Sequence, residues 1–233
     1  VMSDGFGCAG CHPDGRDDGH VWHETEASWH HSMHAFPFSH LGEDLRGRPR
    51  QTTMLAGRVD AIGPYGWKAE SPGLRHRIVT GFHLHRWMGH VSRPEEAIVR
   101  AEALMLFLRR GLAPPPRRER ALTAEQTRGR QLFSDPDVGC ASCHTPASQY
   151  TNRVAAGLGP WRVDGQQFEA EADDDWRFKT PSLTFVGGTP PYFHDGSVAT
   201  LESLIESNGT RMGHTAQLSA ADRRALVAFL ESL

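Results

Sequence analysis

The sequence has no apolar run long enough to cross a membrane. Within the helical stretches the longest such run is Ala103–Leu108, whereas a membrane-spanning helix needs about 20 apolar residues. An excess of charge of one sign is also missing, since 25 Lys and Arg stand against 28 Asp and Glu. Nucleic-acid-binding proteins usually present a basic surface. We therefore expect neither a transmembrane segment nor a nucleic-acid partner.

Cysteine is scarce, and its placement is informative. The four cysteines are Cys8, Cys11, Cys140 and Cys143. A histidine follows each pair directly, as His12 and His144, which gives two segments of the form C-x-x-C-H. This form is the attachment pattern of c-type haem, in which both thiols bond to the haem and the adjacent imidazole binds the iron. A shared zinc site, redox-active cysteine pairs or two disulfides would leave the histidines unexplained, so we predict two covalently attached haems.

Covalent haem attachment also predicts a compartment. Maturation of c-type cytochromes takes place outside the bacterial cytoplasm, so we expect a periplasmic or extracellular protein. No export signal precedes Val1, which suggests a mature, trimmed or partial chain. Only seven residues precede Cys8, too few for the helix that normally comes before a haem-attachment segment. We expect an upstream domain or a partner chain to cover the first haem.

Three helices stand out by their capping residues and apolar spacing. One covers Leu122–Phe133, where Thr123 and Gln126 form a capping-box pattern. A second covers 94–110, and a third begins after Ser219 and should pack on the first. The only strand signal lies at 183–186. We therefore predict an all-α fold.

The chain divides at a proline-rich segment. Pro114, Pro115 and Pro116 end the preceding helix and form a stiff linker. The two halves carry the same features in the same order, namely a C-x-x-C-H segment, a Pro-Tyr turn, a Met-Gly-His segment and a helix that ends in Phe-Leu. This order is typical of an internal repeat. We predict two cytochrome c-like haem domains in tandem, at residues 1–118 and 119–233.

The second axial ligand of each iron sets the reduction potential. For the second haem we favour Met212, because it lies on a loop next to Gly213 before the last helix. His214 is the alternative ligand, and Met212 would then only fill space in the core.

The first haem has several candidate ligands, and they stay open. The repeat points to Met88. Histidines form two competing groups: His83, His85 and His90 near Met88, and His20, His23, His30, His31, His34 and His40 after the first attachment segment. A transition-metal site built from the earlier group is a further alternative.

Other polar residues suggest weaker sites. Arg177 and Lys179 are candidates to bind haem propionates through charge-assisted hydrogen bonds. The acidic segment 14–19 invites a calcium interpretation, but it lacks the ligand spacing of an EF-hand, and a turn with solvated carboxylates fits it better. Trp67 and Trp161 are candidates either for a place between the haems or for the core.

Two longer segments resemble a known family. They are Phe178–Leu183 and Pro191–Glu202, which together with residues 140–144 are similar to the bacterial di-haem cytochrome c peroxidase and MauG superfamily. The resemblance covers residues 122–233 well. It implies that His144 and Met212 are the ligands of an electron-entry haem in the C-terminal half. It also implies a peroxidatic haem in the N-terminal half, where Glu24, Glu26 and Glu43 are candidate acidic groups. MauG-type enzymes place a tyrosine on the second haem, whereas Tyr192 here belongs to the Pro-Tyr turn.

We therefore expect a di-haem cytochrome that transfers single electrons between a redox donor and an acceptor protein. The alternative is a di-haem peroxidase or MauG-like oxidoreductase, in which hydrogen peroxide is reduced at the N-terminal haem with electrons that enter at the C-terminal haem.

Overall fold

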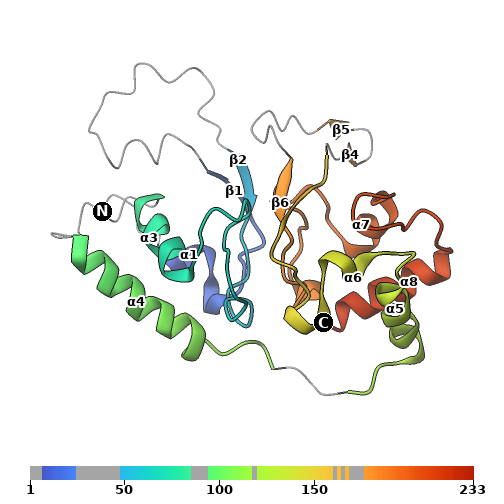
Figure 1. The fold of residues 1–233 in the computed structure, drawn as a ribbon, viewed down its shortest axis with the longest axis horizontal. Helices are drawn as coiled ribbons and strands as arrows, with labels where there is room; N and C mark the ends of the chain where they lie inside the picture. Colours follow the sequence, from blue (N-terminus) through green and yellow to red (C-terminus); the bar gives the residue numbers. More distant parts are fainter. Residues whose placement is uncertain are drawn as a thin grey trace. The chain divides into compact units, whose positions relative to one another are not determined.

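The computed structural model describes residues 7–24, 48–84, 94–116, 120–159, 162–163, 166–167 and 176–233 (Figure 1). The chain forms two compact units. Unit 1 consists of Val1–Gly66 and Glu70–Pro114, and unit 2 of Trp67–Ala69 and Pro115–Leu233. None of the described helices has the length and apolar character that a membrane crossing requires.

Unit 1 begins with the first attachment segment and ends with its longest described helix. Its described elements are α1 (Cys8–Cys11), the 3-10 helix η1 (Pro13–Gly15), β1 (Val21–Glu24), β2 (Arg48–Gln51), α3 (Leu74–Leu84) and α4 (Pro94–Arg110). Helices α3 and α4 pack together around Leu74, Ile78, Ala97 and Ala101, which are all buried.

Unit 2 has a similar order of elements. They are α5 (Ala124–Ser134), α6 (Cys140–Cys143), η3 (Pro146–Ser148), β3 (Ala155–Gly157), β4 (Arg162–Val163), β5 (Gln166–Gln167), β6 (Arg177–Lys179), η4 (Val186–Gly188), α7 (Leu201–Ser207) and α8 (Ala220–Glu231). The core of this unit lies between α5, α7 and α8.

The structure is mostly helical, as predicted, but the all-α description is too strict. Three antiparallel two-stranded sheets are present among the described residues, pairing β1 with β2, β3 with β6 and β4 with β5. The strand predicted at 183–186 is wrong. Phe185 there has a left-handed backbone with φ 61°, and the chain turns into η4. Gly187 packs so closely on α8 that a Cβ would lie 2.8 Å from the Glu231 Cα.

The predicted helix starts are confirmed. Thr123 and Gln126 form the full capping box of α5, and the Ser219 hydroxyl accepts a hydrogen bond from the Asp222 amide at the start of α8. The predicted helix at 94–110 is α4 with the same bounds. Capping supplies partners for helix amides that otherwise have none, so these side chains fix where each helix begins.

Helices α5 and α8 cross at a glycine, as the predicted packing of these two helices requires. A Cβ at Gly129 would lie 1.9 Å from the carbonyl oxygen of Ala225 and 2.7 Å from the Cβ of Phe229. The missing side chain therefore lets the two backbones approach. Beside the crossing, the Phe229 ring packs edge-on against Phe133 and Tyr150, with ring centroids 5.4 and 6.4 Å apart.

The two units share a tyrosine turn as well as their order of elements. Tyr65 bridges to Ser71 in unit 1, and Tyr192 bridges to Val198 in unit 2. The Tyr65 hydroxyl donates to the carbonyl of Ala61 at 2.6 Å, with the Val59 carbonyl also nearby at 3.2 Å, and the Tyr192 hydroxyl donates to the carbonyl of Val186. A helix follows each turn, α3 in unit 1 and α7 in unit 2. These local correspondences support the internal repeat.

The last helix of each unit, α4 or α8, differs in how far its apolar side chains are buried. The sequence Ala103–Leu108 of α4 corresponds to Ala225–Leu230 of α8, with Phe107 at the position of Phe229. Phe229 is only 3% exposed beneath α5, whereas Phe107 is 54% exposed. Ile98, Val99 and Leu106 are also exposed. Within the described part of the chain, the position of α4 that corresponds to Phe229 is therefore mostly exposed.

This difference yields a matched pair of substitutions. We expect Phe229→Ala to lower the free energy of unfolding of unit 2 by about 3–5 kcal/mol, because it leaves a cavity between α5 and α8. Phe107→Ala should change the stability of unit 1 by no more than about 0.5 kcal/mol, because the side chain is largely solvated. Urea unfolding of both variants measures the difference. Equal losses would show that the two helices are covered alike.

The surface ion pair between α5 and α8 predicts a pH dependence. The hydrogen bond from Arg128 Nε to Asp222, 2.8 Å long, holds the pKa of the Asp222 carboxyl below its ordinary value. Stability from this pair is complete above the unfolded-state pKa of about 4 and is lost as pH falls through the lower folded-state pKa. We expect Asp222→Asn to lower the melting temperature slightly at pH 7, less in high salt, and progressively less as pH falls below about 4. An effect that does not change between pH 7 and acid pH would contradict this assignment.

Candidate haem sites

The two attachment segments have the same local structure. Each forms one helical turn, α1 or α6, that carries both cysteines. Each ends at the histidine, whose amide donates to the carbonyl of the first cysteine, from His12 to Cys8 at 2.8 Å and from His144 to Cys140 at 3.0 Å. A single turn therefore holds two thiols and an imidazole within a short segment, as haem attachment requires.

All four cysteines carry free thiols. Burial raises the pKa of Cys140 to about 11, and burial also raises the pKa of Cys8 and Cys11. At neutral pH these three sulfurs are therefore protonated and uncharged. A protonated thiol and a thioether are both uncharged. The surroundings of these sulfurs therefore suit covalent attachment to haem.

The ring of His144 is oriented by the backbone of unit 2. Its Nδ1 lies 3.0 Å from the carbonyl oxygen of Tyr150. Because a carbonyl only accepts hydrogen bonds, the Tyr150 contact places a proton on Nδ1. The ring also has a second backbone hydrogen bond, to Pro181. Burial lowers the pKa of His144 below its ordinary value, so the ring is neutral at neutral pH. A neutral imidazole with its second nitrogen hydrogen-bonded is the usual state of a metal-binding histidine.

The loop that carries Met212 is tied to the second attachment segment. The amide of His214 donates to the carbonyl of Val138 at 2.8 Å, two residues before Cys140. Gly213 makes this contact possible, since it has φ 95° and a Cβ there would lie 2.3 Å from the same carbonyl oxygen. Met212 is partly buried against the core of unit 2, whereas His214 is exposed.

Unit 2 therefore contains a donor set that fits a haem c. Two free thiols, an imidazole oriented by backbone carbonyls and a partly buried thioether all belong to this one unit. Tyr192 is engaged elsewhere, since it is buried and its hydroxyl donates to Val186. Met212 is thus better placed than Tyr192 to serve as the second ligand.

Most candidate ligands of the first haem lie outside the described residues. These are Met88, His85, His90, His30, His31, His34 and His40. The backbones of His83 and His23 are described at the ends of α3 and β1, but their side chains are not. His20 is exposed and packs edge-on against Trp22 at 6.5 Å. The second ligand of the first haem stays a prediction.

The remaining acidic and aromatic candidates are partly described. Trp161, Glu26 and Glu43 lie outside the described residues, as does the side chain of Glu24. Asp17 accepts from the Gly19 amide, and Asp18 from the His20 amide and the Trp22 indole. No group of three or more His, Cys, Asp or Glu suited to a metal ion occurs in the described part of the chain. The turn interpretation of segment 14–19 fits these contacts.

The two candidate propionate ligands lie on β6. Arg177 is exposed, and its guanidinium donates to the carbonyl of Ala155 on the neighbouring strand β3 at 2.6 Å. The amide of Lys179 donates to the carbonyl of Trp67, which belongs to unit 2. Haem binding by either side chain stays a prediction.

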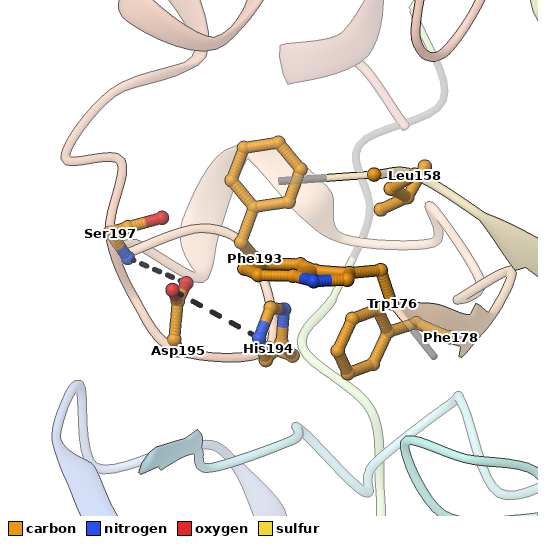
Figure 2. A pocket seen from close by; sticks show the side chains of 8 residues that line it. Leu158, Trp176, Phe178, Phe193, His194, Asp195 and Ser197 are labelled. Atoms are coloured by element: carbon orange, nitrogen blue, oxygen red, sulfur yellow. Dashed lines mark hydrogen bonds and ion pairs between the residues drawn. The ribbon is translucent and has the colours of Figure 1, made fainter. Parts of the chain in front are cut away.

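The family-like segments meet in an aromatic recess of unit 2 (Figure 2). It is lined by Leu158, Gly159, Trp176, Phe178, Phe193, His194, Asp195 and Ser197, and encloses about 230 Å³ including open solvent. His194 is buried, stacks on Phe178 with ring centroids 3.7 Å apart, and contacts Trp67 edge-on. Its Nε2 lies 4.0 Å from the Asp195 carboxylate. The recess fixes the two segments that carry the family resemblance next to each other.

Comparisons with known proteins agree with these sites. Over 277 aligned residues the chain is 25% identical to hydrazine synthase subunit gamma of Kuenenia stuttgartiensis, covering 98% of this chain and 72% of that protein. It is 35% identical to cytochrome c peroxidase Ccp of Escherichia coli and 33% to the methylamine utilization protein MauG of Methylorubrum extorquens. Each of these two matches covers 49% of the chain, but only 26% and 36% of the relative's length.

Solved structures show the same relationship. A structure of Kuenenia stuttgartiensis hydrazine synthase superposes with a TM-score of 0.64 at 25% identity, covering 98% of this chain and 81% of that one. A MauG-like protein associated with microbial copper homeostasis has the same fold, with a TM-score of 0.61, 20% identity and 98% of this chain covered.

No family model matches the chain. The relatives nevertheless confirm the family that the sequence motifs indicated. Proteins of that family bind c-type haems and are typically periplasmic. The chain is similar to the di-haem cytochrome c peroxidase and MauG family, in agreement with its sequence motifs.

Proposed function

We propose that the chain is a periplasmic or extracellular di-haem cytochrome that transfers single electrons, with one haem c on Cys8 and Cys11 and a second on Cys140 and Cys143. The observation that carries this proposal is the arrangement in unit 2, where the loop of Met212 is hydrogen-bonded to the segment that leads into Cys140. The haem-binding domains are residues 1–118 and 119–233, with the linker at the three prolines. Bound haem supplies an iron that accepts and releases one electron.

The residues of unit 2 have separate roles in this proposal. His144 would hold the iron through the ring nitrogen that faces away from Tyr150, and the Tyr150 carbonyl would orient the ring. Met212 would be the second protein ligand, and a neutral thioether ligand would favour the reduced state and raise the potential. Arg177 and Lys179 bind the propionates. A haem with two protein ligands has no open position for a substrate, which suits electron transfer.

The same proposal assigns His12 to the first iron. Met88 is its second ligand by the repeat, with His83, His85, His90 and the His20 to His40 group as alternatives. If this iron also has two firmly bound protein ligands, the whole chain is an electron carrier. If its second ligand is absent or leaves readily, the iron can bind peroxide.

Relatives support partners and also the second candidate function. One relative is a subunit of hydrazine synthase. We therefore propose that this chain binds another protein chain, in addition to a redox donor and an acceptor. Relatives named cytochrome c peroxidase favour a peroxidase that reduces hydrogen peroxide at the N-terminal haem, with electrons entering through unit 2. The chain spans about a quarter to two fifths of the length of the peroxidases it matches.

Ligand substitution tests the proposal in unit 2. We expect the oxidised protein to show the weak far-red charge-transfer absorption of methionine-bound ferric haem. Met212→Ala should remove the part of that absorption that belongs to the second haem and lower its midpoint potential, because water or an added ligand replaces the thioether. His214→Ala is the matched control and should leave both unchanged. The opposite result, with His214→Ala altering the spectrum and Met212→Ala not, would move the ligand to His214.

Peroxide turnover separates the two functions. An electron carrier with two six-coordinate haems should show no high-spin ferric signal, no spectral response to cyanide and no oxidation of a reduced cytochrome by peroxide. The measurement is made on both the oxidised and the half-reduced protein. Turnover that disappears on substitution of one histidine between His20 and His40 would establish the peroxidase and refute the electron carrier.

A further inference from the structure

The side chain of Asn208 lies at the centre of the loop that carries Met212. It follows the last residue of α7 and is only 1% exposed. Its Oδ1 accepts a hydrogen bond from the Met212 amide at 2.8 Å. Its Nδ2 donates to the Gly213 carbonyl and to the Thr215 hydroxyl, both at 3.1 Å. One buried amide therefore bonds to three of the four residues from Met212 to Thr215.

Thr215 extends this network to the body of unit 2. It is buried, and its hydroxyl donates to the carbonyl of Ile205 in α7 at 2.9 Å. Because its only proton is used there, this hydroxyl can meet Asn208 only as an acceptor. The order of donors is thus fixed from the Asn208 amide to the Thr215 hydroxyl to the Ile205 carbonyl. A carboxylate at position 208 cannot replace the amide, since it has no proton to donate.

The loop is held from both sides. Asn208 and Thr215 tie it inward to α7, while the His214 amide ties it to Val138 ahead of Cys140. Buried hydrogen bonds of this kind are costly to leave unmade, because a buried polar group without a partner loses its hydration without compensation. The backbone of Met212 therefore has one strongly preferred position even though its thioether is only partly buried.

We propose that Asn208, with Thr215, is a positioning residue that holds Met212 on the second haem and so sets how readily that ligand leaves. The inference rests on the proposed ligation of this haem by Met212. It goes further, because it assigns the strength of that ligation to a buried amide that does not touch the iron. With the network intact the loop has little freedom to release the thioether, and without it an added ligand competes more easily.

Three variants of the haem-loaded chain test this role. Asn208→Ala removes the amide, Asn208→Asp keeps the acceptor for the Met212 amide but loses both donors, and Thr215→Val removes the hydroxyl. Thr215→Ser keeps the hydroxyl and is the conservative control. The measured quantity is the affinity of the oxidised second haem for added imidazole, followed by loss of the methionine absorption that Met212→Ala removes.

We expect imidazole affinity to rise at least about tenfold in the first three variants, since each loses one or more buried hydrogen bonds of the loop. Their midpoint potentials should also fall, and Thr215→Ser should stay close to the starting protein. Val227→Ala controls for general destabilisation, because it removes buried methyl groups of α8 and none of these hydrogen bonds. It should lower the melting temperature and leave imidazole affinity unchanged.

The outcomes separate this inference from the proposed function. If Met212→Ala abolishes the methionine absorption while Asn208→Ala, Asn208→Asp and Thr215→Val leave imidazole affinity and potential unchanged, Met212 is the ligand and the positioning role is refuted. A rise in affinity that Val227→Ala reproduces would also refute it. If Met212→Ala has no spectral effect, the proposed ligation itself fails, and the positioning role fails with it.

Discussion

The hydrogen bond from the His214 amide to the Val138 carbonyl is the contact on which the site of unit 2 depends. It joins the loop of the proposed methionine ligand to the chain just ahead of the cysteines. Gly213 makes the contact possible, since any side chain there would overlap the carbonyl. Two segments far apart in the sequence, one with the imidazole and one with the thioether, are thereby held in one unit. Asn208 then fixes the same loop from the other side.

The two units have matching local structure at their attachment segments but differ in the burial of their last helices. The attachment turns and the tyrosine turns have matching hydrogen bonds in both units. The last helices of the two units differ in burial, because α5 buries Phe229 of α8 while Phe107 of α4 is mostly exposed. The haem proposed for unit 2 would therefore belong to a domain whose last helix is buried beneath α5.

Much of this arrangement could be predicted from local patterns. The attachment segments, the capping residues Thr123 and Ser219, and the helix at 94–110 depend on short-range chemistry, and the structure confirms the helices. The strand prediction at 183–186 failed because apolar residues there pack in a turn beside Gly187 and Gly188 rather than in a sheet. The short strands were missed because each has few residues, with no alternating pattern long enough to detect. The stacking of His194 on Phe178 and the proposed role of Asn208 depend on contacts between segments that are not adjacent in the sequence. For Asn208 the sequence did offer a signal, since an asparagine precedes the glycine-containing loop of the candidate ligand Met212.

The most direct test of the account is the haem content of the chain after expression with the cytochrome c maturation machinery in the periplasm. Intact mass and the pyridine haemochrome spectrum should show two covalently bound haems, and Cys140→Ala with Cys143→Ala should remove one of them. A purified chain with the mass of the bare polypeptide and no haem absorption, obtained under conditions that mature a control cytochrome, would contradict the account at its foundation.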